Sequence, residues 1–187
     1  PASVVRFCKK LGFSGYSDFK ASLRMDLFEP EATPRKSHPT DFFRDIHKTI
    51  EMVSEETVER IVELIHCSRR IELYAVGSSR MPGSELAKRL QTIGKAAFCY
   101  DDSTLMNISA RQLTSDDLVL ALSISGETSL IIAAATVAKS RGAALVSFTN
   151  LGSNTLSGMA DENLYVNATN FVCSGIPVQS RVQLLML

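Results

Sequence analysis

The sequence predicts an α/β fold in which a five-stranded parallel sheet carries helices on both faces, with a small helical piece ahead of it. From residue 71 onward, short apolar runs alternate with stretches of helical periodicity, which is the pattern of a parallel sheet with crossover helices. The composition, 45% hydrophobic and 21% charged, is typical of a globular protein. Twenty basic and twenty acidic residues cancel, which excludes a uniformly basic surface.

The N-terminal piece, residues 1–28, has the pattern of two short helices. Residues 2–11 favour a helix that ends at Gly12, and Ser17 is a suitable N-cap for a second helix reaching residue 27. Helices this short bury too little surface to be stable alone, so this piece needs either a further segment on its N-terminal side or a partner, and we expect the sequence to be a fragment. Residues 29–40 form a linker, because they include Pro30, Pro34 and Pro39.

The main domain, residues 41–187, begins with two helices and continues as the sheet. Apolar side chains of the first helix recur every three to four residues, and Ser54 caps the second, which has acidic residues in its first turn. Helices over residues 82–93 and 128–140 each end at a glycine. The five expected strands are residues 71–76, 96–100, 118–123, 143–148 and 164–166.

Glycines and hydroxyl side chains follow two of these strands, in each case just before a helix. The first strand leads into residues 77–80 (GSSR), and the third leads into residues 123–128 (SISGET). Glycine lets the backbone approach a ligand, hydroxyls donate hydrogen bonds, and a helix N-terminus offers free N–H groups. In a parallel sheet, ligands bind at the carboxyl ends of the strands. The two loops therefore predict a cradle for an anion, and phosphate is the anion we expect; the alternative is that they are ordinary caps and turns.

Other candidates for chemistry are weaker. The histidines His38, His47 and His66 lie in the linker and leading helices without the spacing of metal ligands. The paired acids at 101–102 and 116–117 flank strands, where turn roles are routine. Glu127 is a better acid candidate, although its charge would oppose a bound phosphate unless the side chain points away. We can assemble no set of nucleophile, base and orienting group.

The four cysteines indicate neither zinc nor a disulfide framework. They lie far apart in the chain, without any C-x-x-C pair, and we expect reduced, mostly buried thiols. They are Cys8, Cys67, Cys99 and Cys173. Since no run of 18 apolar residues and no secretory signal is present, we expect a cytoplasmic protein that contacts no membrane.

The two loops resemble the signature loops of the sugar isomerase (SIS) domain, which is a five-stranded parallel α/β sandwich that binds phosphosugars. The matching stretches are residues 75–79 (AVGSS) and 122–128 (LSISGET), and residues 138–161 resemble the fourth strand and following helix of that domain. The resemblance implies that Ser78 and Ser79 contact the sugar phosphate or nearby hydroxyls. It implies that Ser123, Ser125 and Thr128 hold the phosphate.

The N-terminal piece resembles the end of the helix-turn-helix in RpiR-family transcriptional regulators, where such a head precedes a SIS domain. The matching residues are 2–13 (ASVVRFCKKLGF) and 15–20 (GYSDFK). The resemblance implies that Ser3 and Arg6 lie near the DNA face, whereas Lys9, Lys10 and Lys20 meet phosphates. A solvated helix face is the alternative for these cations. The helices that precede the recognition helix in the family are absent from this sequence.

The resemblance implies a DNA-binding regulator of sugar metabolism whose SIS domain senses a phosphosugar. It further implies operator DNA as a partner of the full-length protein, and a homodimer or homotetramer. We expect no cofactor, no metal and no catalytic residue, because no acid or base matching the SIS isomerases is found. The alternative is a phosphosugar isomerase of the SIS family, which would have no use for a recognition helix.

Overall fold

The computed structural model describes residues 2–10, 39–173 and 176–179, and the chain forms two compact units. The first unit, residues 1–37, contributes helix α1 (Ala2–Lys10). The second helix expected from Ser17, and most of the expected linker, lie outside the described residues. Within the described residues, no helix is long and apolar enough to cross a membrane.

The second unit is built on a five-stranded sheet in which every pairing is parallel. Its order is β2-β1-β3-β4-β5, with β1 and β3 side by side near the centre. Every residue of β3 is buried, as expected for a parallel strand covered on both faces. The strands are β1 (Arg70–Ala75), β2 (Ala97–Tyr100), β3 (Asp117–Leu122), β4 (Ala144–Asn150) and β5 (Glu162–Val166). The predicted α/β sheet with helices on both faces is therefore confirmed.

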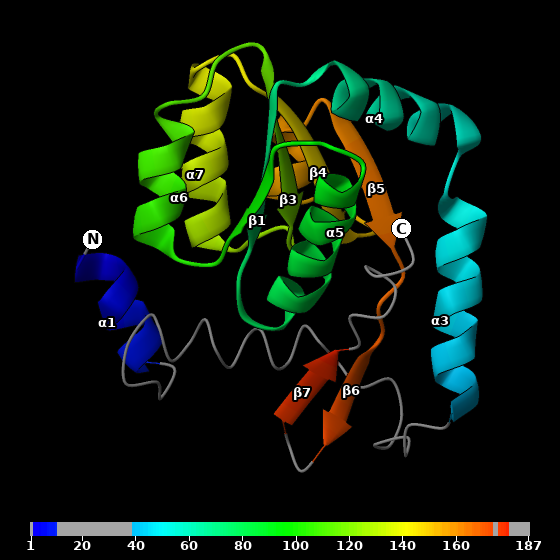
Figure 1. Ribbon diagram of the computed structural model, residues 1–187. Coiled ribbons are helices and arrows are strands. Elements are labelled where there is room, and N and C mark those ends of the chain that lie inside the picture. Colours follow the sequence, from blue (N-terminus) through cyan, green and yellow to red (C-terminus); the bar gives the residue numbers. More distant parts are fainter. Residues whose placement is uncertain (1, 11–38, 174–175, 180–187) are drawn as a thin grey trace. The chain divides into compact units, whose positions relative to one another are not determined.

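The helices cover the two faces of the sheet in separate groups. Those of this unit are α3 (Pro39–Met52), α4 (Glu55–Cys67), α5 (Arg80–Thr92), α6 (Ser103–Ala110), α7 (Ser129–Ser140) and α8 (Thr155–Met159). In Figure 1, α6 and α7 lie together on one face and α5 lies on the other. A right-handed crossover places its helix according to the direction in which the chain moves along the sheet. Through α5 the chain moves from β1 to β2, toward one edge of the sheet. Through α6, α7 and α8 it moves toward the opposite edge, so these helices lie on the other face.

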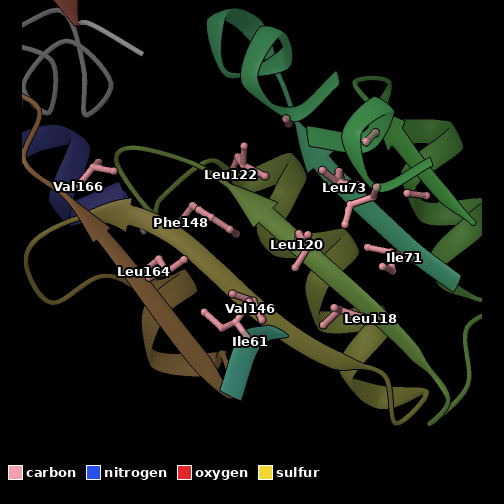
Figure 2. Close-up of a cluster of buried hydrophobic side chains, with 14 of the residues drawn as sticks. Ile61, Ile71, Leu73, Leu118, Leu120, Leu122, Val146, Phe148, Leu164 and Val166 are labelled. Carbon is pink, nitrogen blue, oxygen red and sulfur yellow. The ribbon is translucent and has the colours of Figure 1, made fainter. Parts of the chain in front are cut away.

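Alternate side chains of the strands point into two separate hydrophobic cores. Ile71 and Leu73 of β1 face the core beneath α4 and α5, drawn in Figure 2, whereas Tyr74 faces the core beneath α6 and α7. Leu120, on the neighbouring strand β3, is fully buried in the first of these cores. Full burial of one such aliphatic side chain contributes about 1.5–3 kcal/mol. The two cores hold the carboxyl ends of β1 and β3 at a common edge.

Three features of the second unit differ from expectation. Helix α3 begins at Pro39, inside the segment expected to be linker, because proline suits the first helical position. Helix α6 is not among the expected helices: it has apolar residues on its exposed side, Leu105 and Ile108, as well as on its buried side, so its sequence shows no single apolar stripe. The short strands β6 (Asn170–Cys173) and β7 (Ile176–Gln179) pair antiparallel beyond the expected last strand.

A buried carboxylate fastens α3 to the segment that follows β5. Asp45 is 1% exposed, and its Oδ1 accepts hydrogen bonds from Asn167 Nδ2 at 2.7 Å and Thr169 Oγ1 at 2.8 Å. Its Oδ2 accepts from the Thr169 N–H at 2.8 Å. Thr49 completes the group, donating to the Asp45 carbonyl and accepting from the Asn167 N–H. Since buried carboxylates are stabilised only by such partners, α3 is held in one position on its unit.

Candidate functional site

The two loops singled out in the sequence lie next to each other at the point where the strand order reverses. From β1 the chain crosses to β2 at one edge, then returns to β3 on the other side of β1. The register pairs Ala75 with Leu122, the last residues of β1 and β3, so the loops that follow leave the sheet together. Reversal of strand order in an open α/β sheet opens the crevice in which ligands bind.

The loop after β1 is a tight 3-10 turn, Gly77–Ser79, that leads directly into α5. Gly77 has φ +58°, a conformation that favours glycine. Ser78 is exposed at the surface, whereas Ser79 is buried at the N-cap of α5 without a side-chain capping bond. Arg80, the first residue of α5, pairs with Asp101 at 3.0 Å and remains largely exposed. This loop brings two hydroxyls and one cation to the edge.

The loop after β3 turns back on itself and presents three hydroxyls. The Gly126 N–H donates to the Ser123 carbonyl at 2.9 Å, which closes a turn, and Gly126 has φ +63°. Ser123 is buried, and its Oγ lies 2.8 Å from Thr128 Oγ1. Ser125 is exposed, and its Oγ accepts from the Glu127 N–H at 3.2 Å. The structure therefore brings Ser123, Ser125 and Thr128 into one short turn.

Helix α7 starts at this turn with an N-terminus that no side chain caps. Thr128 is the N-cap residue, but its side chain makes no capping bond and lies against Ser123 instead. The first turn of α7 holds no acidic residue. The first N–H groups of a helix need an acceptor, and the helix dipole favours a negative one. With the adjacent hydroxyls, this N-terminus has the chemistry of an anion-binding site.

Glu127, the acid candidate within this loop, is bonded to the start of α8. Its Oε1 accepts from the Thr155 N–H at 2.7 Å, and its Oε2 accepts from Thr155 Oγ1 at 2.8 Å. Its carboxylate is thus used as a hydrogen-bond acceptor toward α8. This contact spans 28 residues of sequence, and sequence reasoning missed it.

A shallow cavity of about 490 Å³ lies beside the β4 end of the same edge. Its lining residues are Leu151, Gly152, Ser153, Asn154, Ser157, Gly158 and Tyr165. Asn154 lies at once in this cavity and against Gly126 of the turn. Sequence reasoning assigned no role to Asn154, although an asparagine just before a short helix is a recognisable N-cap signal.

The other titratable residues considered as candidates lie on exposed helix surfaces or take part in structural contacts. His47 and His66 are exposed on α3 and α4, and the described part of the chain holds no cluster of metal-ligating side chains. Asp102 caps α6 by accepting from the Leu105 N–H. Asp117 is buried with Arg69 and Thr114 as partners. Cys8, Cys67 and Cys99 are free thiols, and Cys173 is outside the residues whose side chains are described.

Glu72 of β1 is also a buried acid, and it lies away from the carboxyl edge of the sheet that carries the two loops. It accepts hydrogen bonds from Tyr74 Oη at 2.7 Å and from Ser109 Oγ, beneath α6. Burial, followed by the adjacent Glu72 charge, raises the pKa of Tyr74. Because these groups satisfy each other in the middle of the strand, we read the cluster as part of the core.

The residues predicted to meet DNA fall partly on α1 of the first unit. Ser3, Arg6, Lys9 and Lys10 all lie within this helix, and the side chains of Arg6 and Lys10 are exposed. Lys20 lies outside the described residues. A basic, exposed stretch of helix fits contact with a phosphate backbone.

Comparisons with known protein families match both parts of the chain. The model of the SIS domain matches residues 64–187, and the model of the helix-turn-helix domain of the rpiR family matches residues 1–30. An uncharacterized HTH-type transcriptional regulator of Bacillus subtilis, YbbH, is 28% identical over 182 residues, which is 90% of this chain. The chain spans 64% of the length of that relative.

Two solved structures resemble the chain closely in fold. The Vibrio vulnificus NanR protein, complexed with ManNAc-6P, has a TM-score of 0.75 and 31% identity, and the match covers 99% of this chain and 70% of NanR. The sugar isomerase domain of an RpiR transcription factor from Sphaerobacter thermophilus has a TM-score of 0.72, covering 79% of this chain and 80% of that one. Its identity is 20%, so this second likeness concerns the fold alone.

Proposed function

The chain belongs to the SIS domain family and carries an rpiR-type helix-turn-helix domain ahead of that domain, and we propose from this that it is a transcriptional regulator that senses a phosphorylated sugar. The observation that carries the proposal is the order of the two domains in one chain. A sensor placed after a DNA-binding head gives a ligand a route to control operator binding. We propose that such a regulator acts in the cytoplasm and that operator DNA is its binding partner.

The geometry at the carboxyl edge of the sheet supports a phosphosugar as the ligand class. Ser123, Ser125 and Thr128 surround the uncapped start of α7, and Ser78 and Ser79 follow the neighbouring strand. Hydrogen bonds from such donors to a charged phosphate are about twice as strong as those between neutral groups. The similar NanR protein was solved with ManNAc-6P bound, which favours the same class here.

Replacing Ser125 with alanine should weaken phosphosugar binding about tenfold or more, because one lost hydrogen bond to a charged group removes about 1.5–3 kcal/mol. Ser125 is exposed, so the fold should be unaffected. Isothermal titration against N-acetylmannosamine 6-phosphate, glucose 6-phosphate and fructose 6-phosphate measures the change. Ser140→Ala, at the other end of α7, is the matched control. Equal affinity for a sugar and its phosphate would contradict the proposal.

For the DNA-binding head, we propose that Ser3 and Arg6 face the bases and that Lys9, Lys10 and Lys20 contact phosphates. Exposed Arg6 and Lys10 on α1 support this assignment. Regulators with such heads bind inverted repeats as dimers, and we propose a homodimer or homotetramer for this protein.

We also propose that the ligand is sensed without being converted. Moving a proton between adjacent sugar carbons needs a base within about 3 Å of them. Glu127, the acid carried by the phosphate loop, already accepts two bonds from Thr155. His47 and His66 lie on the leading helices.

One experiment separates this regulator from a phosphosugar isomerase. The full-length protein should bind an inverted-repeat operator with an affinity that falls steeply as salt rises and that changes when the phosphosugar is added. In heavy water, the same phosphosugar should gain no deuterium at C1 or C2, as followed by NMR. Deuterium incorporation that is lost in Glu127→Gln or His66→Ala would instead show an enzyme.

A further inference from the structure

We propose that Glu127 is the positioning residue of the phosphate site: its carboxyl group fastens the loop after β3 to the first turn of α8 through its hydrogen bonds to Thr155. The inference rests on the proposed phosphosugar site. It goes further by assigning a role to the one acidic side chain in a loop meant to hold an anion. Three observations support it, from α8, from the loop and from the chemistry of the contact.

The first observation is how α8 satisfies its first N–H groups. The Thr155 N–H donates to Glu127 Oε1 at 2.7 Å, and the Leu156 N–H donates to the Gly126 carbonyl at 3.1 Å. The next two N–H groups, of residues 157 and 158, donate to the side chain and carbonyl of Asn154. Helix N-termini normally rely on caps from their own preceding residues. Here two of the four acceptors come from the loop after β3.

The second observation is that the loop is held from the other side as well. The Ser123 N–H donates to the Phe148 carbonyl at 3.0 Å, and the Asn150 N–H donates to the Ile124 carbonyl at 2.8 Å. The base of the loop is thus paired with β4. Glu127 is the contact beyond the turn, one residue before Thr128 and the start of α7. Losing it would loosen the part of the loop nearest the uncapped helix, which is also held by the Leu156 N–H bond to the Gly126 carbonyl and by the Ser123–Thr128 contact.

The third observation concerns charge. A carboxylate beside a bound phosphate is unfavourable because like charges repel, and solvent screens this repulsion at the exposed Glu127. The bonds to Thr155 do not require that charge. Glutamine at this position could accept the Thr155 N–H with its oxygen and donate its amide hydrogen to Thr155 Oγ1, since a hydroxyl both donates and accepts. Alanine could do neither.

The experiment compares Glu127→Ala with Glu127→Gln in the full-length protein. Isothermal titration measures the affinity for N-acetylmannosamine 6-phosphate, glucose 6-phosphate, fructose 6-phosphate and inorganic phosphate. Glu127→Ala should bind about tenfold more weakly, since two hydrogen bonds that order the loop are lost. Glu127→Gln should bind at least as tightly as wild type, because glutamine keeps the contact with Thr155. Glu59→Gln, which removes an exposed charge on α4, is the control for net charge.

Amide hydrogen exchange without ligand gives a second measurement. The Thr155 N–H should exchange slowly in wild type and in Glu127→Gln, and at least tenfold faster in Glu127→Ala. Loss of affinity in both variants would overturn the inference, because the charge itself would then be needed. Unchanged affinity in Glu127→Ala would overturn it too. Failure of wild type to bind any of the four probes would instead overturn the proposed function, which distinguishes the two.

Discussion

Replacing Asp45 with alanine should lower the free energy of unfolding by about 3 kcal/mol, because three hydrogen bonds to a buried carboxylate are lost and each contributes about 1 kcal/mol. The donors are Asn167 Nδ2, the Thr169 N–H and Thr169 Oγ1. For a domain of this size, such a loss lowers the melting temperature by about 6–12 °C. Thermal and urea unfolding measure the change.

Two variants control this result. Glu59→Ala removes an exposed acid from α4, so its effect should stay within about 0.5 kcal/mol. Asp45→Asn keeps the shape and one acceptor oxygen, and we expect a loss between those of the other two. An Asp45→Ala protein as stable as wild type would show that water replaces the carboxylate, so that α3 does not depend on this contact.

Replacing Gly126 with alanine should cost about 2–3 kcal/mol in total, shared between stability and phosphosugar affinity. The residue has φ +63°, where a side chain costs about 1–2 kcal/mol. A Cβ there would overlap Asn154 Oδ1, which caps α8 by accepting from the Ser157 N–H. Displacing that cap costs about 1 kcal/mol more. Titration with the tightest phosphosugar and thermal unfolding together measure the sum.

The matched control is Gly94→Ala at the end of α5. Gly94 has φ +85°, and a Cβ there would meet nothing within 4 Å. This variant should therefore lose about 1 kcal/mol of stability from strain alone, with unchanged affinity. If Gly126→Ala weakened binding no more than Gly94→Ala, the contact between the turn and Asn154 would have no part in holding the site.

The sheet and the position of the two loops follow from local sequence patterns. Each strand is a short apolar run, and glycines with hydroxyls mark the turns after β1 and β3. Such signals lie within a few residues of one another, so the sequence displays them directly. Helix α6 gives no such signal, because the exposed Leu105 and Ile108 obscure the apolar stripe formed by the buried Met106 and Ala110.

The contacts that fix the site could not be predicted in the same way. Glu127 and Thr155 are 28 residues apart, and Asp45 and Thr169 are 124 apart. Their pairing depends on which strands become neighbours and in what register, and no local pattern encodes that choice. Asn154 was the one accessible signal, since asparagine before a short helix indicates an N-cap.

The separation of Asp45 from its partners also sets an order of events during synthesis. At about 5–20 residues per second, the ribosome needs roughly 6–25 s to add the 124 residues between Asp45 and Thr169. Throughout that time the carboxylate has none of the acceptor contacts found in the finished unit. Helix α3 is therefore among the first parts of this unit to be made and among the last to be fastened. Any nascent chain that stops before Asn167 leaves the Asp45 carboxylate without these bonds.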